Sequence, residues 1–117
     1  MVSDMIKKIL NSIKYSYNGF SATFACDFSF RLEIIALPFL VVLLVFLPGT
    51  IFRKILMFAA YLIVPCLELL NSAIEKLADR VTTEHDVMIG FAKDAASAAV
   101  MLSLILVAII WIGCLWY

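Results

Sequence analysis

The stretch AASAAVMLSLILVAIIWIGCLWY occupies residues 95–117 and contains no charged side chain. An α-helix needs about 20 predominantly apolar residues to cross the hydrocarbon core of a bilayer. This stretch therefore predicts a membrane-spanning helix. The aromatic residues near its end, Trp111, Trp116 and Tyr117, fit the belt that such helices place at a membrane surface.

Two more apolar segments precede this one, and the turn signal Pro48-Gly49 marks the boundary between them. We expect three spans, over residues about 31–48, about 53–80 and about 90–117. Between about residues 3 and 25, apolar side chains recur every three or four positions with lysines and asparagines between them, which predicts an amphipathic helix on the membrane surface. The sequence thus predicts an all-α integral membrane protein, with residues 1–117 forming a single membrane-embedded domain.

The composition supports a membrane protein and argues against a nucleic-acid-binding one. Hydrophobic residues make up 65% of the chain and charged residues 15%, whereas soluble domains are nearer half apolar and a quarter charged. The net charge is zero, so the charge totals argue against a nucleic-acid-binding protein. Of the nine Lys and Arg residues, only Arg53 and Lys54 fall between the first two predicted spans. The positive-inside rule then places the N-terminus and the second loop in the cytoplasm.

Four polar residues share one face of the second predicted span. Glu68, Asn71, Glu75 and Asp79 follow one another at steps of three, four and four residues, which places them within an arc of roughly 80° on a helix. Each charge near hydrocarbon costs on the order of 3 kcal/mol, and a divalent cation would offset that cost. Polar groups that only bind neighbouring helices are the alternative, but such contacts rarely need several carboxylates in line. We expect Glu68, the deepest, to be a general base, and Glu75 and Asp79 to suit Mg²⁺ and its waters.

The next segment carries a lysine that could bind phosphate. Lys93, Asp94 and Ser97 lie at the cytoplasmic mouth of the third predicted span, although a lysine there could also simply extend to the membrane surface. The chain has no Walker A loop, no GxGxxG and no protein-kinase signature, so any nucleotide must be held by Mg²⁺, carboxylates and a lysine. His85 is the only histidine and the three cysteines are far apart, so neither a zinc site nor a hydrolase triad is indicated.

Two motifs, ELLNSAIEKLADR at residues 68–80 and GFAKDAASAAV at 90–100, resemble the signature of the small prokaryotic trimembrane diacylglycerol kinase family. The resemblance extends over nearly the whole chain. It implies ATP- and Mg²⁺-dependent phosphorylation of the diacylglycerol hydroxyl to give phosphatidic acid. It also implies a homotrimer in the bacterial inner membrane, with active sites between protomers at the cytoplasmic surface.

Position by position, the resemblance assigns roles to residues of this chain. It makes Glu68 the catalytic base and Asp27 and Glu75 the metal ligands. It implies that the following residues contact ATP: Lys8, Tyr15, Asp27, Glu75, Asp79, Glu84, His85, Asp86, Lys93 and Asp94. It implies that the following residues contact the lipid substrate: Lys8, Arg31, Glu33, Glu68, Asn71, Ser97 and Trp111.

The chain departs from the family pattern at two of these positions. Asp27 stands where a metal-binding Glu is usual, so a small backbone shift or a bridging water must make up for a carboxylate one methylene shorter. Lys8 stands where Arg is usual and lacks its planar fork. These departures bear on nucleotide affinity more than on reaction type. The loop histidine, His85, also stands one residue away from its usual position in the family pattern.

Two other functions remain open at this point. The first is an undecaprenol kinase of the same fold, although NSAIE and SAAV in this chain favour diacylglycerol. The second is a non-catalytic membrane subunit in which Glu68 and Glu75 form a carboxylate relay.

Overall fold

The computed structural model describes residues 1–116, which form four α-helices and no strand. Helix α1 spans Val2–Cys26, α2 spans Phe28–Phe46, α3 spans Ile51–Val81 and α4 spans Val87–Trp116. The predicted all-α class and the three long apolar helices are confirmed, since α2, α3 and α4 are each long and apolar enough to cross a membrane. Tyr117, the predicted last residue of the third span, lies outside the described residues.

Several helix ends lie two or three residues from the predicted boundaries, and two of them have a local reason that the structure shows. Helix α2 ends at Phe46, before the predicted 48, because Leu47 precedes a proline and is extended, with φ −68° and ψ 138°. Helix α4 begins at Val87, before the predicted 90. The carboxylate of Asp86 accepts hydrogen bonds from the backbone N–H groups of Met88 (2.9 Å) and Ile89 (3.0 Å), and this stabilises an earlier helix start.

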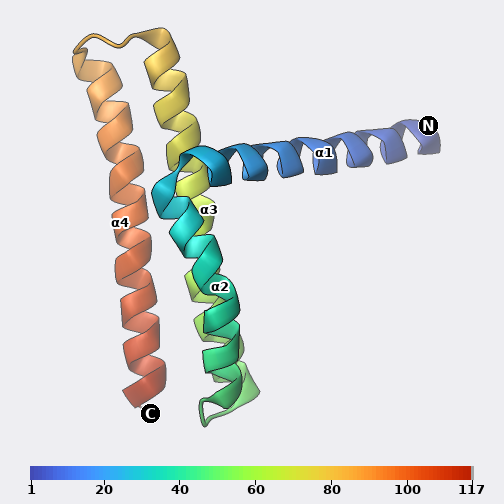
Figure 1. Ribbon diagram of the computed structural model, residues 1–117, viewed down its shortest axis with the longest axis vertical. Coiled ribbons are helices and arrows are strands. Elements are labelled where there is room, and N and C mark those ends of the chain that lie inside the picture. The colour runs from blue at the N-terminus through green and yellow to red at the C-terminus, as the bar shows by residue number, and fades with distance from the viewer. Residues whose placement is uncertain (117) are drawn as a thin grey trace.

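Helix α3 is the central element of the molecule. It packs against both α2 and α4, while α1 leaves the bundle at a steep angle and extends away from it (Figure 1). Most of the buried side chains belong to α3, among them Met57, Ala60 and Val64. No side chain of α1 is buried. The C-terminal end of α3 and the first turns of α4 continue past the level of α1 as a helical hairpin (Figure 1).

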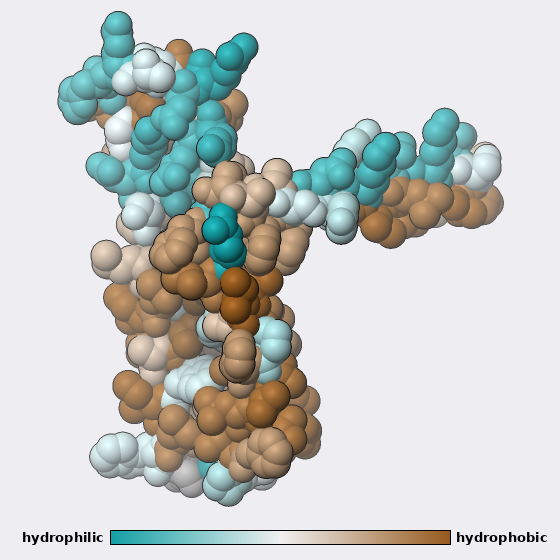
Figure 2. Space-filling view, in the orientation of Figure 1, coloured by the Kyte–Doolittle hydropathy of each residue, from teal (hydrophilic) through white to brown (hydrophobic). Residues whose placement is uncertain are grey.

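The distribution of apolar surface indicates how the molecule sits in a bilayer. Figure 2 shows a hydrophobic band around the lower bundle and a hydrophilic cap on the α3–α4 hairpin. Helix α1 is hydrophilic along its upper edge and hydrophobic along the edge that faces the same side as the band (Figure 2). An amphipathic helix of this kind lies in the membrane interface with its apolar face towards the acyl chains. The level of α1 therefore marks the membrane surface, and the hairpin stands above it.

The connection between α1 and α2, which we call the elbow, consists of Asp27 and the residues that bond to it and to the end of α1. Asp27 is extended and caps α2 by accepting a hydrogen bond from the Phe30 N–H at 3.1 Å. The guanidinium of Arg31 donates to the last carbonyls of α1, those of Phe24 (2.9 Å) and Ala25 (2.7 Å). Helix α1 has no basic residue in its own last turn, so Arg31 supplies the cation that its C-terminus favours.

The turn at the opposite end of the bundle is closed by side chains as well. Gly49 has φ +133°, a conformation that residues with a Cβ rarely adopt. The Thr50 hydroxyl caps α3 by accepting from the Arg53 N–H at 3.3 Å. Lys54 donates to the Val45 carbonyl at the end of α2, at 3.3 Å. The two cations that the sequence places on this side thus lie at helix ends near the bottom of the apolar band.

Candidate functional site

A pocket of about 410 Å³ lies between the elbow and α3, and three carboxyl groups line it. Asp27 comes from the elbow, and Glu68 and Glu75 come from α3, two turns apart. We call this the acidic pocket. Its other lining residues are Cys26, Phe28, Ser29, Asn71, Ser72 and Lys76. The helical spacing that predicts a shared face for Glu68, Asn71 and Glu75 is thus what brings them to one cavity.

The carboxyl of Asp27 is tied into both helices that it joins. One oxygen caps α2, and the other accepts a hydrogen bond from the Ser72 hydroxyl of α3. Burial alone would raise the pKa of Asp27. The hydrogen bonds from Ser72, from the Phe30 and Ser29 backbones and from the neighbouring Glu68 carboxyl outweigh burial and hold this pKa below its ordinary value. Asp27 is therefore a stable anion at the mouth of the pocket.

The bottom of the pocket contains polar groups that the protein itself does not fully satisfy. Glu68, Asn71 and Ser72 are all buried. The Asn71 amide nitrogen donates to Glu75 Oε1 at 3.3 Å, but the buried Asn71 Oδ1 has no hydrogen-bond partner among residues 1–116. Buried acceptors are nearly always paired in proteins, so an unpaired one beside a cavity is suited to a donor or cation supplied by a ligand.

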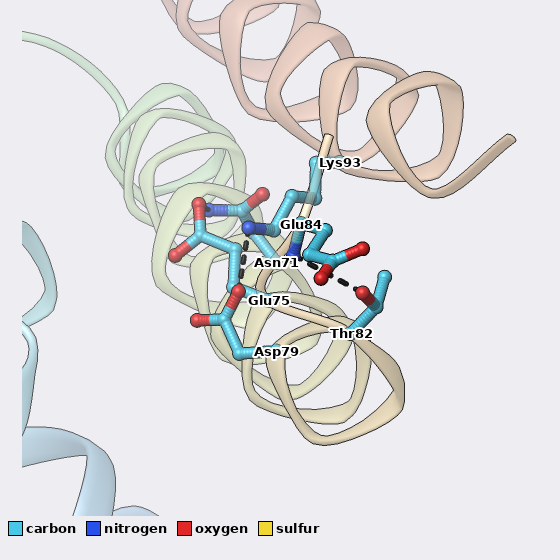
Figure 3. A network of polar contacts seen from close by, with 6 residues as sticks. All are labelled: Asn71, Glu75, Asp79, Thr82, Glu84 and Lys93. Carbon is cyan, nitrogen blue, oxygen red and sulfur yellow. Dashed lines mark hydrogen bonds and ion pairs between the residues drawn. The ribbon is translucent and has the colours of Figure 1, made fainter. Parts of the chain in front are cut away.

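A second polar group stands above the pocket on the α3–α4 hairpin. Lys93 reaches from α4 to α3, where its ammonium pairs with Asp79 Oδ1 at 2.6 Å. Figure 3 shows Asn71, Glu75 and Asp79 along α3, with Lys93 and Glu84 approaching from the other side. Helix α3 therefore presents carboxylates at three heights, from the buried Glu68 to the exposed Asp79, over about 16 Å of helix.

The donor set of the acidic pocket suits a magnesium ion that arrives with phosphate. Among residues 1–116, no three His, Cys, Asp or Glu side chains come close enough together to hold a metal ion by themselves. Mg²⁺ in phosphoryl-transfer sites is usually held by one or two carboxylates, with substrate phosphates and waters completing its shell. Asp27, Glu75 and the unpaired Asn71 Oδ1 offer oxygen atoms of the right kind.

Several residues that the resemblance assigns to the site lie away from the acidic pocket in a single chain. Lys8 and Tyr15 lie on the polar side of α1, in a separate hollow with Asp4, Lys7, Asn11 and Ser12. Glu84, His85 and Asp86 are exposed at the tip of the hairpin, and Asp86 is engaged in capping α4. Asp94 is exposed beside Lys93.

The residues assigned to the lipid are also dispersed. The Arg31 guanidinium is occupied by the carbonyls at the end of α1. The Glu33 carbonyl accepts from the Tyr61 hydroxyl at 2.7 Å, while Glu33 Oε2 is buried without a hydrogen-bond partner in the described part of the chain. Ser97 is exposed on α4. Trp111 donates to the Met57 carbonyl at 3.1 Å, about 27 Å along α4 from Lys93.

The sequence patterns predict no role for Ser72 and Lys76, two α3 residues that line the pocket. In the motif Ser72 only follows Asn71, but in the structure its hydroxyl donates the hydrogen bond that connects α3 to Asp27. Lys76 directly follows Glu75 and lies at the edge of the acidic pocket. Helical spacing places both near the polar face. The partner of Ser72 lies on the elbow, however, so spacing along one helix gives no signal for that contact.

Comparison with known proteins finds similar sequences over most of the chain. The sequence model described as prokaryotic diacylglycerol kinase matches residues 14–115. The chain is 41% identical over 109 residues to a diacylglycerol kinase of Haemophilus influenzae, an alignment that covers 93% of this chain and 92% of that protein. It is 34% identical to the Escherichia coli K12 diacylglycerol kinase, covering 93% and 89%. It is 36% identical to that of Pseudomonas aeruginosa, covering 91% and 86%.

Proposed function

Because the chain belongs to the prokaryotic diacylglycerol kinase family and is a lipid kinase of the bacterial membrane, we propose the following reaction. The enzyme transfers the γ-phosphoryl group of ATP to the free hydroxyl of diacylglycerol, giving phosphatidic acid and ADP. In this step the hydroxyl oxygen forms a bond to phosphorus, the bond from phosphorus to the bridging oxygen of ADP breaks, and the hydroxyl proton passes to a base.

The observation that carries this proposal is the position of the acidic pocket relative to the membrane surface. The pocket lies at the elbow, at the level where α1 leaves the bundle (Figure 1). A diacylglycerol molecule holds its hydroxyl at the same level, with its acyl chains in the hydrocarbon below. A nucleotide can reach that level from the hydrophilic hairpin above (Figure 2).

Within the pocket, depth separates the proposed roles. Glu68 is buried and lies about 10 Å below Glu75 along α3, so it is placed to accept the proton of a hydroxyl that enters from the bilayer. Asp27 and Glu75 would hold Mg²⁺ together with the nucleotide phosphates, and the ion supplies neutralisation of the charge on the transferring group. The Asn71 amide orients Glu75 through their hydrogen bond.

The nucleotide and lipid contacts are proposed for residues around the pocket. Lys93 is placed to bind phosphate if its pairing with Asp79 opens or is shared with the nucleotide. Further nucleotide contacts are proposed for Lys8, Tyr15, Glu84, His85, Asp86 and Asp94. Lipid contacts are proposed for Arg31, Glu33, Ser97 and Trp111, with Lys8 and Asn71.

We further propose that the enzyme is a homotrimer held together along α3. Seven exposed α3 residues recur at alternating steps of three and four, with larger side chains alternating with small ones: Leu56, Ala59, Ile63, Cys66, Leu70, Ala73 and Leu77. We call this row the α3 seam. A seven-residue repeat with small residues is the pattern through which helices pack closely in bundles and in membranes. A partner protomer would also bring α1 of one chain near the hairpin of another, and so gather the dispersed nucleotide residues.

The orientation follows from the charges. Seven of the nine Lys and Arg residues lie with α1 and the hairpin, and the other two lie at the α2–α3 turn. We propose that α1 and the hairpin face the cytoplasm.

One assay tests the activity and separates the alternatives. Purified full-length protein in mixed micelles is supplied with labelled ATP and Mg²⁺, and with diacylglycerol or undecaprenol in separate reactions. We expect label in phosphatidic acid, and loss of that label when the Mg²⁺ is chelated. Preferential labelling of undecaprenol would identify the protein as an undecaprenol kinase. Labelling of neither lipid would favour a non-catalytic membrane subunit.

A further inference from the structure

Lys76 lies where two hollows of the protein meet. It lines the acidic pocket, and it also lines an apolar groove of about 660 Å³ between α1 and α3. The groove is formed mainly by residues of α1 such as Phe20 and Thr23 and by Leu69 of α3. Two further lining residues, Leu70 and Ala73, belong to the α3 seam, so a partner protomer would border the groove. Cys26, Ser72 and Lys76 line both hollows, so the two are contiguous.

The acidic pocket has an excess of negative charge, and Lys76 is the one cation among its lining residues. Three carboxyl groups and a single ammonium group therefore belong to the lining residues. Lys93 belongs to a different group, since it pairs with Asp79 and does not line the pocket. Within the part of the chain that the structure describes, Lys76 forms no ion pair, so its donors are available to a ligand.

Once Mg²⁺ and ADP have left, the proposed reaction leaves a specific need for a cation at this place. Its product carries a phosphomonoester, with a charge between −1 and −2 near neutral pH, beside Asp27, Glu68 and Glu75. Like charges in a partly buried site repel strongly, whereas the uncharged diacylglycerol meets no such repulsion. A lysine offers a compact charge with three donors on a stem that can lie along apolar surface, which matches the boundary between an acidic pocket and an apolar groove.

We propose that the Lys76 ammonium binds the phosphate of the lipid product, and so sets how tightly the enzyme holds phosphatidic acid relative to diacylglycerol. The proposal rests on the lipid kinase function above. It makes Lys76 a specificity residue for the phosphorylated lipid. This role differs from that of Lys93, which is proposed to bind the phosphates of the nucleotide.

The test compares the binding of a charged and an uncharged lipid by titration calorimetry in detergent, with full-length protein and no nucleotide. The probes are dihexanoyl phosphatidic acid, dihexanoylglycerol and inorganic phosphate. The variants are Lys76→Gln, which removes the charge, and Lys76→Arg, which keeps it. Lys14→Gln is the matched control, because it removes a cation from exposed α1 that lines neither hollow.

We expect Lys76→Gln to weaken phosphatidic acid binding about tenfold, equivalent to about 1.4 kcal/mol, with dihexanoylglycerol binding unchanged. Lys76→Arg and Lys14→Gln should bind phosphatidic acid within about twofold of wild type. Equal losses in Lys76→Gln and Lys14→Gln would show a general attraction of the basic surface for anions and overturn the proposal. So would a loss of dihexanoylglycerol binding in Lys76→Gln, or inorganic phosphate binding through Lys76 as tightly as the lipid.

This experiment also distinguishes failure of the inference from failure of the proposed function. If wild-type protein phosphorylates diacylglycerol but Lys76→Gln binds the product normally, only the role of Lys76 is wrong. If wild-type protein neither phosphorylates diacylglycerol nor binds dihexanoyl phosphatidic acid, the lipid kinase reaction itself is wrong for this chain.

Discussion

At the scale of single residues, the carboxyl groups of the acidic pocket differ in their burial and in the helix or connection that supplies them. Glu68 is buried and Glu75 is exposed on the same helix face, while Asp27 reaches them from another element. The helical spacing of Glu68, Asn71 and Glu75 makes their grouping predictable from the sequence. The approach of Asp27 to Ser72 is not predictable in this way, because these residues are 45 positions apart and meet only through packing of the elbow on α3.

Replacement of Glu68 by Gln tests whether that residue has a chemical role or a binding role. The amide keeps the size of the side chain but cannot take a proton, and a well-placed base contributes a factor of roughly 10² to 10⁴. We expect turnover with diacylglycerol to fall by about that factor, while Mg-nucleotide affinity stays within about twofold because Asp27, Glu75 and Lys93 are unchanged. Parallel measurement of the phosphorylation rate and of nucleotide binding decides this. Normal turnover with weakened nucleotide binding would move the base to Asp79 or Asp94.

The depressed pKa of Asp27 predicts a pH-dependent contribution to stability. A carboxyl group whose pKa is lower in the folded state stabilises that state above its unfolded value of 3.8, and the contribution disappears as the pH falls through the lower folded value. The variant Asp27→Asn should therefore melt at a lower temperature than wild type at pH 7. The difference should shrink as the pH falls below 3.8. Thermal unfolding in detergent across this range measures it, and a difference that is independent of pH would show that the charge of Asp27 does not matter.

At the scale of elements, the helices were largely predictable and their junctions were not. Long apolar runs predict α2, α3 and α4, and periodic apolar residues predict α1, because each pattern lies within one segment. The role of Arg31 depends on the direction in which α1 leaves the bundle, since its partners are the carbonyls of Phe24 and Ala25. The pattern of apolar and polar residues in the sequence does not determine the direction of α1.

We expect Arg31→Gln to loosen the elbow without unfolding the bundle. The substitution removes the two hydrogen bonds and the cation at the end of α1, which has no buried side chain to hold it otherwise. Spin labels at positions 12 and 83, in a protein lacking its native cysteines, would report the distance between α1 and the hairpin. The distance distribution should broaden in Arg31→Gln and change less in Arg31→Lys, which keeps the charge. An unchanged distribution in Arg31→Gln would show that other contacts set the angle.

At the scale of the whole molecule, a single chain leaves much of its chemistry dispersed. Lys8 and Tyr15 on α1 are remote from the acidic pocket, and α1 itself extends away from the bundle (Figure 1). The exposed α3 seam offers a route by which copies of the chain can associate and bring these parts together.

The native cysteines provide a direct test of the α3 seam. Cys66 lies in the seam, whereas Cys26 lies at the elbow and Cys114 near the end of α4. A short bifunctional thiol reagent should join protomers through Cys66 in membranes, and the linked species should disappear on electrophoresis when Cys66 is replaced by Ala. Replacement of Cys114 should leave it unchanged. Cross-linking that depends on Cys114 and not on Cys66 would place the contact on α4.

The elbow also has a consequence for the order in which a newly made chain matures. Helix α1 is synthesised first, but the groups that fix its direction come later: Arg31 follows in α2, and Ser72, the partner of Asp27, follows in α3. Until the ribosome has produced most of α3, the surface helix can bind the lipid interface but has no fixed angle to the rest of the protein. The earliest made of the four helices is thus among the last to reach its final position.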